Sequence, residues 1–327
     1  MKLSLIQDVC ADINSQHESQ LADAILQLWD HDPGSARFWR ASANFVFFFK
    51  FKGQGQVLRF VDAAGRSLAQ IEAELEFVSF LADAGVRLAR PCRSKAGSLV
   101  EHHTTLLGVF HAVVFEAASG VELDFGALNT YQFVRWGAAL GALHNRAARF
   151  TKPGRITWQQ QLDELDTQLK EGESAARVSL TDVTSRMRSL PATRDTFGLI
   201  HGDFELDNLI WSEDRGACII DFDDCSWNWF AADVAFALRD LFNDDPKLFD
   251  ENHLSYRAFI SGYRAQRGIE PDDLANIPLF MRFHNLIRFG RLLTAATPPQ
   301  PGGELSWIPE LRTKLVGKIA GYRARFS

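Results

Sequence analysis

The chain has 327 residues, 46% hydrophobic and 23% charged, which is the composition of a globular protein with room for two lobes and a real core. Its formal net charge of −6 argues against a nucleic-acid partner, because a protein that neutralises phosphates usually needs a basic face. The longest apolar run, Phe45 to Phe49, is far too short to span a bilayer, and the N-terminus becomes acidic at Asp8 before a signal-peptide core can form. The four cysteines form no C-x-x-C pair, and we interpret them as reduced packing residues. We therefore expect a cytoplasmic protein that binds neither nucleic acid nor membrane.

The first part of the chain is predicted to contain one or two helices followed by a β-hairpin. Apolar residues at helical spacing over residues 5–30 indicate the helices. Residues 44–52 and 57–61 are rich in β-branched and aromatic side chains, and a glycine-containing stretch separates them. This is the pattern of two strands joined by a turn.

A single cation interrupts the second of these strands. Alternation places Leu58 and Phe60 on one face of the strand and Arg59 on the other. Arg59 is then either an edge-strand arginine whose charged end reaches solvent, or a ligand for an anion. The next element is a predicted helix over residues 68–84, and one of its glutamates could pair with Arg59 while the others are solvated. These glutamates are Glu72, Glu74 and Glu76.

Two further strands are predicted, the last of which ends at Glu116, and a short connector leads to Gly120. After Gly120 the sequence patterns are mainly those of helices. His144 lies at the polar edge of one of the predicted helices, where we expect it to pack and not to carry out chemistry. A loop interrupts the last helices at Pro298–Gly303. The predicted helices cover residues 131–150, 158–190, 231–242, 253–267, 274–295 and 309–324.

The densest set of polar groups lies between two short apolar strands. His201 to Asn208 follows one apolar run, and a second apolar run ends on Asp221. Carboxylates gathered at the ends of strands repel one another unless a cation lies among them. Asp and Asn oxygens suit a hard divalent ion, so magnesium is expected before zinc.

A metal ion, a cation and a carboxylate that acts as general base are together what phosphoryl transfer needs. Arg59, paired with a helical glutamate, would supply the cation, and Asp203 would orient the attacking hydroxyl. The chain contains no G-x-x-x-x-G-K-[ST] sequence, which excludes a P-loop enzyme at the level of motifs.

At these residues the sequence resembles the aminoglycoside phosphotransferase and choline kinase superfamily, with its homoserine-kinase-like members. The catalytic loop of that family, H-G-D-x-x-x-x-N, matches His201 to Asn208 at every fixed position. Its second signature, an apolar strand that ends in I-D-F/W/L, matches Ile220 to Phe222. The resemblance implies an α+β, bilobal, protein-kinase-like fold, with a strand-rich N-lobe over residues 1–116 and a mainly helical C-lobe over residues 117–327. It implies an ATP- and Mg²⁺-dependent kinase that acts on a hydroxyl of a small molecule such as an amino alcohol, an amino acid or an aminoglycoside.

The resemblance also assigns roles to individual residues. Asp203 resembles the catalytic base, and Asn208 and Asp221 resemble the metal ligands. His201 and Asp233 resemble structural supports of the catalytic loop.

In the N-lobe, Arg59 stands where the family has a lysine, and its planar fork suits phosphate. Glu74 resembles its partner on the following helix, with Glu72 as the second choice. Glu116 resembles the start of the hinge, whose backbone would contact the adenine.

Two further features depart from the family pattern. Asp223, in Asp-Phe-Asp-Asp, either joins the metal site or binds only water. The stretch from Ser42 to Asn44 occupies the place of a glycine-rich phosphate loop but contains no glycine.

The acceptor pocket is expected near Asp203, among the C-terminal helices, where acidic and aromatic groups would favour a cationic amino alcohol. Its expected lining is Glu205, Asp207, Trp227, Trp229 and residues of Arg282 to Arg288. Two other interpretations stay open: a nucleotide-binding protein of the same fold without catalysis, and a metal-dependent hydrolase with His201 and Asp203 as ligands.

Overall fold

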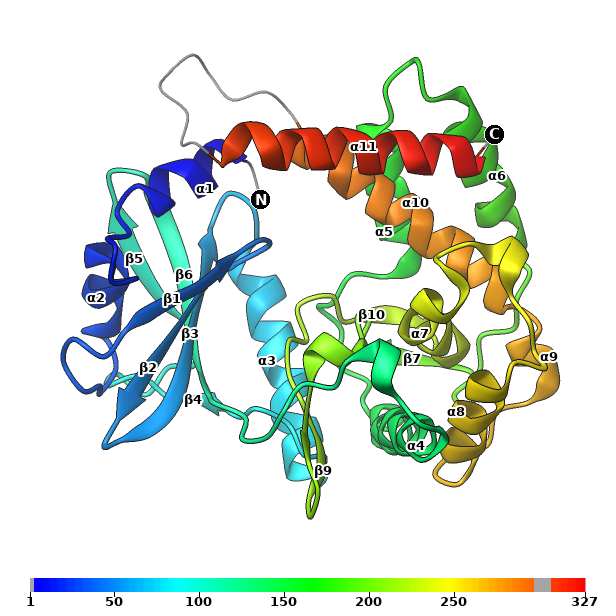
Figure 1. Cartoon of the computed structure of the whole chain (residues 1–327), viewed down its shortest axis with the longest axis horizontal. Coiled ribbons are helices and arrows are strands. Elements are labelled where there is room, and N and C mark those ends of the chain that lie inside the picture. Colours follow the sequence, from blue (N-terminus) through cyan, green and yellow to red (C-terminus); the bar gives the residue numbers. More distant parts are fainter. Residues whose placement is uncertain (1–2, 297–306, 327) are drawn as a thin grey trace. The chain divides into compact units, whose positions relative to one another are not determined.

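A computed structural model describes residues 3–296 and 307–326, and its contacts divide the chain into two units (Figure 1). The first unit comprises Met1–Ser79, Ala89–Ala117 and Leu292–Ile319. The second unit comprises Phe80–Leu88, Ala118–Arg291 and Ala320–Ser327. The loop predicted at Pro298–Gly303 lies outside the described residues. Strands dominate the first unit and helices the second, as an α+β chain requires.

The first unit is built on an antiparallel sheet, whose strands lie in the order β1-β2-β3-β6-β4, with β5 paired to β6. The predicted hairpin is present, and Lys52 and Gly53 form its turn with positive φ angles of 51° and 74°. Because β3 lies between β2 and β6, Arg59 is on a central strand, so the edge-strand interpretation is wrong. The strands are β1 (Arg37–Ala41), β2 (Phe45–Phe51), β3 (Gln54–Asp62), β4 (Pro91–Cys92), β5 (Glu101–Thr105) and β6 (Gly108–Glu116).

Helices cover both faces of this sheet. The predicted N-terminal helices are α1 (Leu3–Cys10) and α2 (Gln20–Leu26), and their apolar side chains pack with Leu58 and Phe60. Helix α3 (Leu68–Asp83) packs on the other face, where its Ile71 and Leu75 contact the side chains of β3 and β6. Figure 1 shows α2 and α3 on opposite sides of the strands. The alternation predicted for β3 is therefore confirmed, and it points Arg59 to the face that α3 covers.

Capping explains where several helices of the second unit begin. Asn129 and Gln132 form a capping box at the start of α4, and Thr157 and Gln160 form another at the start of α5. The helix predicted over residues 158–190 is in fact two helices, because Leu169 leaves the helical conformation with ψ 121°. The α-helices that follow β6 along the chain are α4 (Thr130–Ala147), α5 (Trp158–Gln168), α6 (Ser174–Arg188), α7 (Phe230–Ala237), α8 (Leu254–Arg264), α9 (Pro271–Leu274), α10 (Ile277–Ala295) and α11 (Ile308–Phe326).

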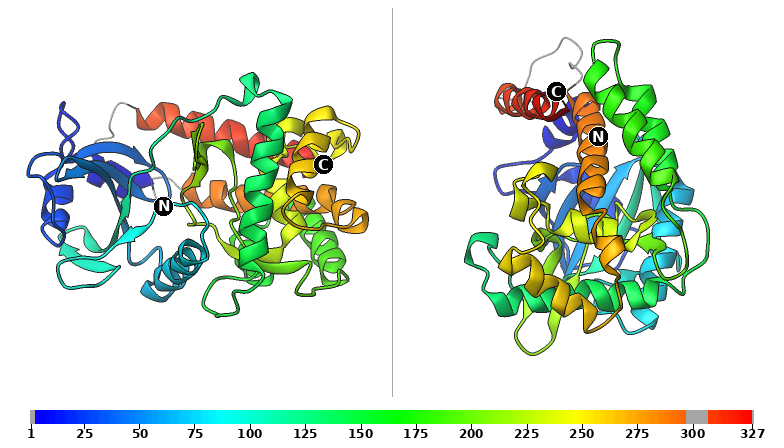
Figure 2. Two further views of the ribbon diagram at one scale, coloured as in Figure 1. Left: turned by 90° about the horizontal axis from the view of Figure 1, so that it is seen from below. Right: turned by 90° about the vertical axis from the view of Figure 1, so that its right-hand side faces the viewer.

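Short 3₁₀ turns connect several of these elements. The helix predicted over residues 231–242 ends at Ala237, and its last part is the 3₁₀ turn η3. In the described residues these turns are η1 (Phe125–Ala127), η2 (Leu206–Asn208), η3 (Arg239–Phe242) and η4 (Pro246–Leu248). Figure 2 shows the helices of this unit from two further sides.

Two small antiparallel sheets carry the polar central stretch. Strand β7 (Phe197–Ile200) pairs with β10 (Ser226–Trp229), and β8 (Leu209–Ser212) forms a hairpin with β9 (Gly216–Ile219). The catalytic-loop candidate thus leaves β7 and enters β8. Within residues 3–296 and 307–326, no helix is both long and apolar enough to cross a membrane. Each of the four cysteines, all of which lie in that part of the chain, is a free thiol.

Candidate active site

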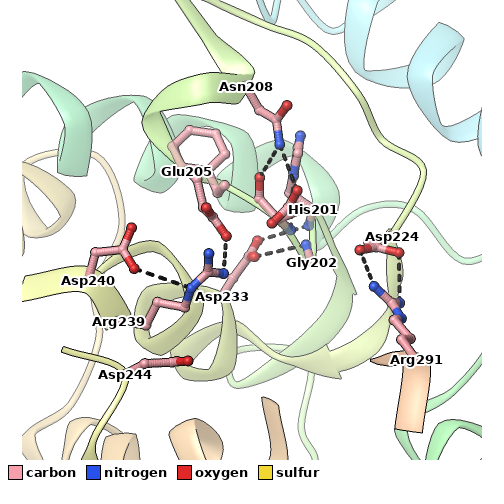
Figure 3. Close-up of polar contacts among 12 residues, drawn as sticks. His201, Gly202, Glu205, Asn208, Asp224, Asp233, Arg239, Asp240, Asp244 and Arg291 are labelled. Atoms are coloured by element: carbon pink, nitrogen blue, oxygen red, sulfur yellow. Dashed lines mark hydrogen bonds and ion pairs between the residues drawn. The ribbon is translucent and has the colours of Figure 1, made fainter. Parts of the chain in front are cut away.

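Asp233 holds the start of the loop through backbone hydrogen bonds (Figure 3). Its carboxylate, on the first turn of α7 and fully buried, accepts from the backbone N–H of His201 at 2.8 Å and of Gly202 at 2.9 Å. The Nε2 atom of His144 lies 2.9 Å from the same carboxylate, and the Nδ1 atom lies 2.9 Å from the Tyr263 hydroxyl. Burial lowers the pKa of His144, although Asp233 opposes the shift, so the ring is a neutral donor at pH 7. His144 therefore supports the loop through its contact with Asp233 and is not a reactive group of the site.

His201 joins the two polar segments. Its Nδ1 accepts from the backbone N–H of Asp203 at 3.2 Å, so the proton lies on Nε2, which donates to the Ile220 carbonyl at 3.1 Å. Both ring nitrogens of this fully buried side chain are engaged with backbone, which leaves no lone pair for a metal ion. The hydrolase interpretation, which needs His201 as a ligand, gains no support from this geometry.

Gly202 occupies a position where a side chain has no space. Its φ is +84°, and a Cβ atom would lie 2.2 Å from the carbonyl oxygen of Asp224. The backbone of the loop therefore rests directly on the backbone of the Asp221–Asp224 segment.

Asp203 and Asn208 face each other across the loop. The Nδ2 atom of Asn208 donates to both the backbone carbonyl and the Oδ2 of Asp203, each at 2.8 Å. Because the amide nitrogen is used in this way, the Oδ1 atom of Asn208 is turned away from Asp203 (Figure 3). Trp136 Nε1 donates to the Phe204 carbonyl at 3.3 Å and holds the middle of the loop against α4. Asp203 itself is half-buried.

The β8–β9 hairpin brings Asp221 to the same place. Leu209 pairs with Ile219, and the backbone N–H of Ile220 donates to the Asn208 carbonyl at 3.0 Å. Asp221, the next residue, has a φ of +59°. This left-handed conformation costs a non-glycine residue about 1–3 kcal/mol, and such strain is found mostly at functional sites. Asp203, Asn208 and Asp221 are thus brought together by one loop and one hairpin.

The residues after Asp221 are held by two arginines that the sequence did not single out. Buried Arg155 donates from Nε to the Cys225 carbonyl at 2.8 Å and from Nη2 to the Asp223 carbonyl at 2.7 Å. Arg291 of α10 binds the Asp224 carboxylate with both Nη atoms, at 2.6 and 2.8 Å. The Asp224 side chain therefore has a structural partner. The Asp223 side chain is half-buried.

The chemistry of the oxygen atoms at this point suits a hard divalent cation. Asn208 offers its amide oxygen Oδ1, and Asp221 and Asp223 offer carboxylate oxygens. Magnesium prefers oxygen ligands of this kind. In the part of the chain that the structure describes, no three His, Cys, Asp or Glu side chains form a ready-made metal cluster. Magnesium usually keeps several waters and takes substrate phosphates as ligands, so one amide and two carboxylates fit its needs without such a cluster.

In the first unit, Arg59 and Glu74 form a buried ion pair. Arg59 Nη2 lies 2.7 Å from Glu74 Oε1, and the two residues are 8% and 0% exposed. The guanidinium also lies over the ring of Phe115, 5.0 Å from its centroid. Glu72, the second choice of partner, is exposed on the other side of α3. The spacing of charges along α3 could not separate the two glutamates, because burial decides between them.

The other candidate nucleotide-binding residues of the N-lobe are Asn44, Ser42 and Glu116. Asn44 is buried and lines a small hollow together with Arg59, Arg66 and His111. Ser42 is exposed in the β1–β2 turn, where its N–H donates to the Asn44 carbonyl at 3.1 Å. Glu116, at the end of β6, has an exposed side chain and donates its backbone N–H to the Arg90 carbonyl at 2.9 Å.

Replacement of Glu74 by Ala should lower the free energy of unfolding by about 3–5 kcal/mol, because it leaves the buried Arg59 cation without its closest counter-ion. Urea denaturation measures the change. Glu72→Ala is the matched control on the same helix, and as an exposed substitution it should change stability by about 0.5 kcal/mol or less. Equal losses in the two variants would contradict the buried-pair assignment.

The expected acceptor-pocket residues separate into two groups. Glu205 contacts Arg239 beside the catalytic loop, and Arg288 acts electrostatically on the same glutamate. Trp229, by contrast, is buried opposite Phe197, at the end of β7 farther from His201.

Asp207 is exposed, and Trp227 lines a separate hollow with Trp158 and Phe197. Arg282 is bound to Asp182 of α6 at 2.6 Å. We therefore withdraw the two tryptophans and Arg282 from the acceptor pocket. The sequence could not reveal this, because alternation along β10 does not say which end of the strand meets the loop.

Comparison with known proteins adds an independent finding. A family model described as "Phosphotransferase enzyme family" matches residues 36–269, well over half of the chain. Amicoumacin kinase of Bacillus subtilis (strain 168) is 26% identical over 289 residues, which cover 84% of this chain and 85% of the relative. A homoserine kinase of Methylorubrum populi is 28% identical over 225 residues, which cover 64% of this chain and 66% of the relative.

Solved structures show the same fold. An amicoumacin kinase in complex with AMP-PNP, Ca²⁺ and Ami has a TM-score of 0.80 at 22% identity, and the match covers 98% of this chain and 95% of that one. A microcompartment-associated aminopropanol kinase has a TM-score of 0.72 at 22% identity, and the match covers 93% of this chain and 95% of that one. The predicted protein-kinase-like α+β fold is confirmed.

Proposed function

Because the chain belongs to the phosphotransferase enzyme family, we propose that it transfers the terminal phosphoryl group of ATP, in the presence of Mg²⁺, to a hydroxyl group of a small molecule. The observation that carries this proposal is the convergence of Asp203, Asn208 and Asp221, in which Asn208 touches Asp203 at 2.8 Å and its own carbonyl binds the residue before Asp221. Small-molecule kinases among the relatives support the reaction class. We assign nucleotide binding mainly to residues 1–116 and the catalytic loop, metal site and acceptor pocket to residues 117–327.

Each residue has a task that its surroundings allow. Asp203, fixed by Asn208, accepts a hydrogen bond from the acceptor hydroxyl and aims its oxygen at the phosphorus, since positioning is most of what phosphoryl transfer asks of a protein. Asn208 Oδ1 and Asp221, with Asp223 beside them, hold the cation. When bound, magnesium neutralises charge on the phosphate oxygens.

The other family residues bind the nucleotide or hold the catalytic loop. Arg59, oriented by Glu74, binds a nucleotide phosphate as a planar fork. The backbone after Glu116 contacts the adenine, and the turn from Ser42 to Asn44 covers the phosphates. His201 and Asp233 keep the loop in shape.

The experiment is a screen for acceptor-dependent ADP release with ATP and Mg²⁺, over amino alcohols, amino acids, sugars and aminoglycosides. Phosphate-ester formation is verified by ³¹P NMR. We expect at least one amino-group-bearing alcohol to be phosphorylated. If ATP–Mg²⁺ neither binds in a calorimetric titration nor yields an ester with any compound, the proposal is wrong. ATP binding without any ester would favour a nucleotide-binding protein without catalysis.

A further inference from the structure

Two residues beyond Asp203, a glutamate faces the same space. The backbone N–H of Glu205 donates to the Asp203 carbonyl at 2.8 Å, so the chain turns back on itself between the two residues. Figure 3 shows the Glu205 carboxylate pointing to Arg239 of η3, next to Asp233. The Glu205 and Arg239 side chains form an ion pair and are 18% and 8% exposed. Glu205 is therefore withdrawn from bulk water at the point where an acceptor must lie.

Negative charge exceeds positive charge around this pair. Arg239 is surrounded by the carboxylates of Glu205, Asp240, Asp203 and Asp244. The Asp240 carboxylate lies 3.6 Å from Arg239 Nε.

The groups that face the pair from other elements do not correct the imbalance. Asp244 has its own partners, because it accepts from the Tyr322 hydroxyl at 2.9 Å and lies 3.2 Å from Arg325 Nη1. On α10, Arg288 is the second cation near Glu205, whereas burial and the nearby arginines lower the pKa of His284 well below its usual value and keep it neutral. Three carboxylates, those of Asp203, Glu205 and Asp240, thus face Arg239 and Arg288. A third arginine, Arg291, also acts on Asp203 but is bound to Asp224.

A further positive charge between the carboxylates of Asp203 and Glu205 would relieve their repulsion.

We propose that Glu205, held by Arg239, is the specificity residue that binds the ammonium group of an amino-alcohol acceptor whose hydroxyl lies on Asp203. The inference rests on the phosphotransferase function proposed above and narrows its acceptor class. Glu205 lies two residues beyond Asp203 and its backbone N–H is bound to the Asp203 carbonyl, so the acceptor nitrogen and oxygen must also be close. In 1,2- and 1,3-amino alcohols these atoms are about 3–5 Å apart, given bond lengths of about 1.5 Å. Arg239 keeps the Glu205 carboxylate in place before the acceptor arrives. Because Arg239 occupies one carboxylate oxygen of Glu205, the ammonium group of the acceptor must bind the other oxygen.

The test compares matched acceptors that differ only in the charged group: 1-amino-2-propanol against 1,2-propanediol, and 2-aminoethanol against ethylene glycol. For the unmodified protein, kcat/KM should be higher for each amino alcohol than for its diol. Glu205→Gln keeps the shape but removes the charge, and it should lower the amino-alcohol to diol ratio of kcat/KM by about 10- to 100-fold, since a hydrogen bond to a charged group is worth about that much. The KM for ATP should stay within about threefold of the original value.

Controls separate specificity from folding. Glu213→Gln, an exposed residue in the β8–β9 turn, should leave the ratio unchanged. Glu205→Asp keeps the charge and should restore part of the ratio, which a merely structural ion pair would not do. Thermal unfolding verifies that each variant is folded.

The outcomes distinguish this inference from the proposed function. If the unmodified protein uses amino alcohols and diols equally well, or Glu205→Gln lowers both by the same factor, the inference is overturned and the kinase activity stands. If neither class is phosphorylated while a compound without an amino group is, the inference again fails alone. If no compound is phosphorylated at all, both proposals fail.

Discussion

Asp203→Asn should lower kcat by about 10²- to 10⁴-fold, with little change in the free energy of unfolding. The amide oxygen of the new residue can still accept the hydrogen bond that Asn208 Nδ2 gives to Asp203 Oδ2 at 2.8 Å, so the loop keeps its shape. What is lost is the carboxylate that accepts the proton of the acceptor hydroxyl. The binding of ATP–Mg²⁺ should persist, because the residues assigned to the metal and the phosphates are unchanged.

Asp207→Asn is the matched control for this variant. Asp207 lies on the same loop, four residues away, but its side chain is exposed. Kinetics with the best acceptor from the screen, together with calorimetric binding of ATP–Mg²⁺, measure the difference. If Asp203→Asn keeps more than a tenth of the original kcat, Asp203 is not the catalytic base, and Asp207 would be examined next.

Asp233→Ala should lower the free energy of unfolding by about 3–5 kcal/mol. Three donors converge on this fully buried carboxylate, namely the N–H groups of His201 and Gly202 and the Nε2 of His144. Removing the acceptor leaves these donors buried without it, at about 1–3 kcal/mol for each unsatisfied group. We also expect kcat to fall, because the start of the catalytic loop is no longer held.

Urea denaturation measures the stability change, with Asp195→Ala as the control. Asp195 is an exposed residue just before β7, and its loss should change stability by about 0.5 kcal/mol or less. A loss below about 1 kcal/mol for Asp233→Ala would show that the loop is held chiefly by other contacts, such as that from Trp136 to the Phe204 carbonyl.

The sequence could predict those parts of the molecule that depend on local pattern. The β2–β3 hairpin follows from alternation and turn residues, and the apolar stripe of α3 follows from helical periodicity. The pairing of the Asp203 loop with Asp221 follows from a family signature, not from periodicity. Strand β1 was missed because most of its residues are exposed and its charges break the alternation.

Long-range contacts left no such pattern. Arg155 binds carbonyls about 70 positions away, Arg239 meets Glu205, and His144 reaches Asp233 from another helix. Each is a common residue type in an ordinary stretch, and only the folded chain brings it to the loop. The break at Leu169, which divides the helix predicted over residues 158–190, is likewise not marked by a proline in the sequence.

Gly202 sets a boundary for laboratory evolution of the acceptor range. A methyl group there would need the same volume as the Asp224 carbonyl oxygen, 2.2 Å away, so even alanine must push one backbone segment off the other. In libraries that randomise the whole His201–Asn208 stretch, most variants will therefore carry a residue other than glycine at position 202 and will not form this loop, whatever their other substitutions. Diversity confined to the Glu205 and Arg239 positions would explore new substrates while the framework that aligns the reacting groups stays untouched.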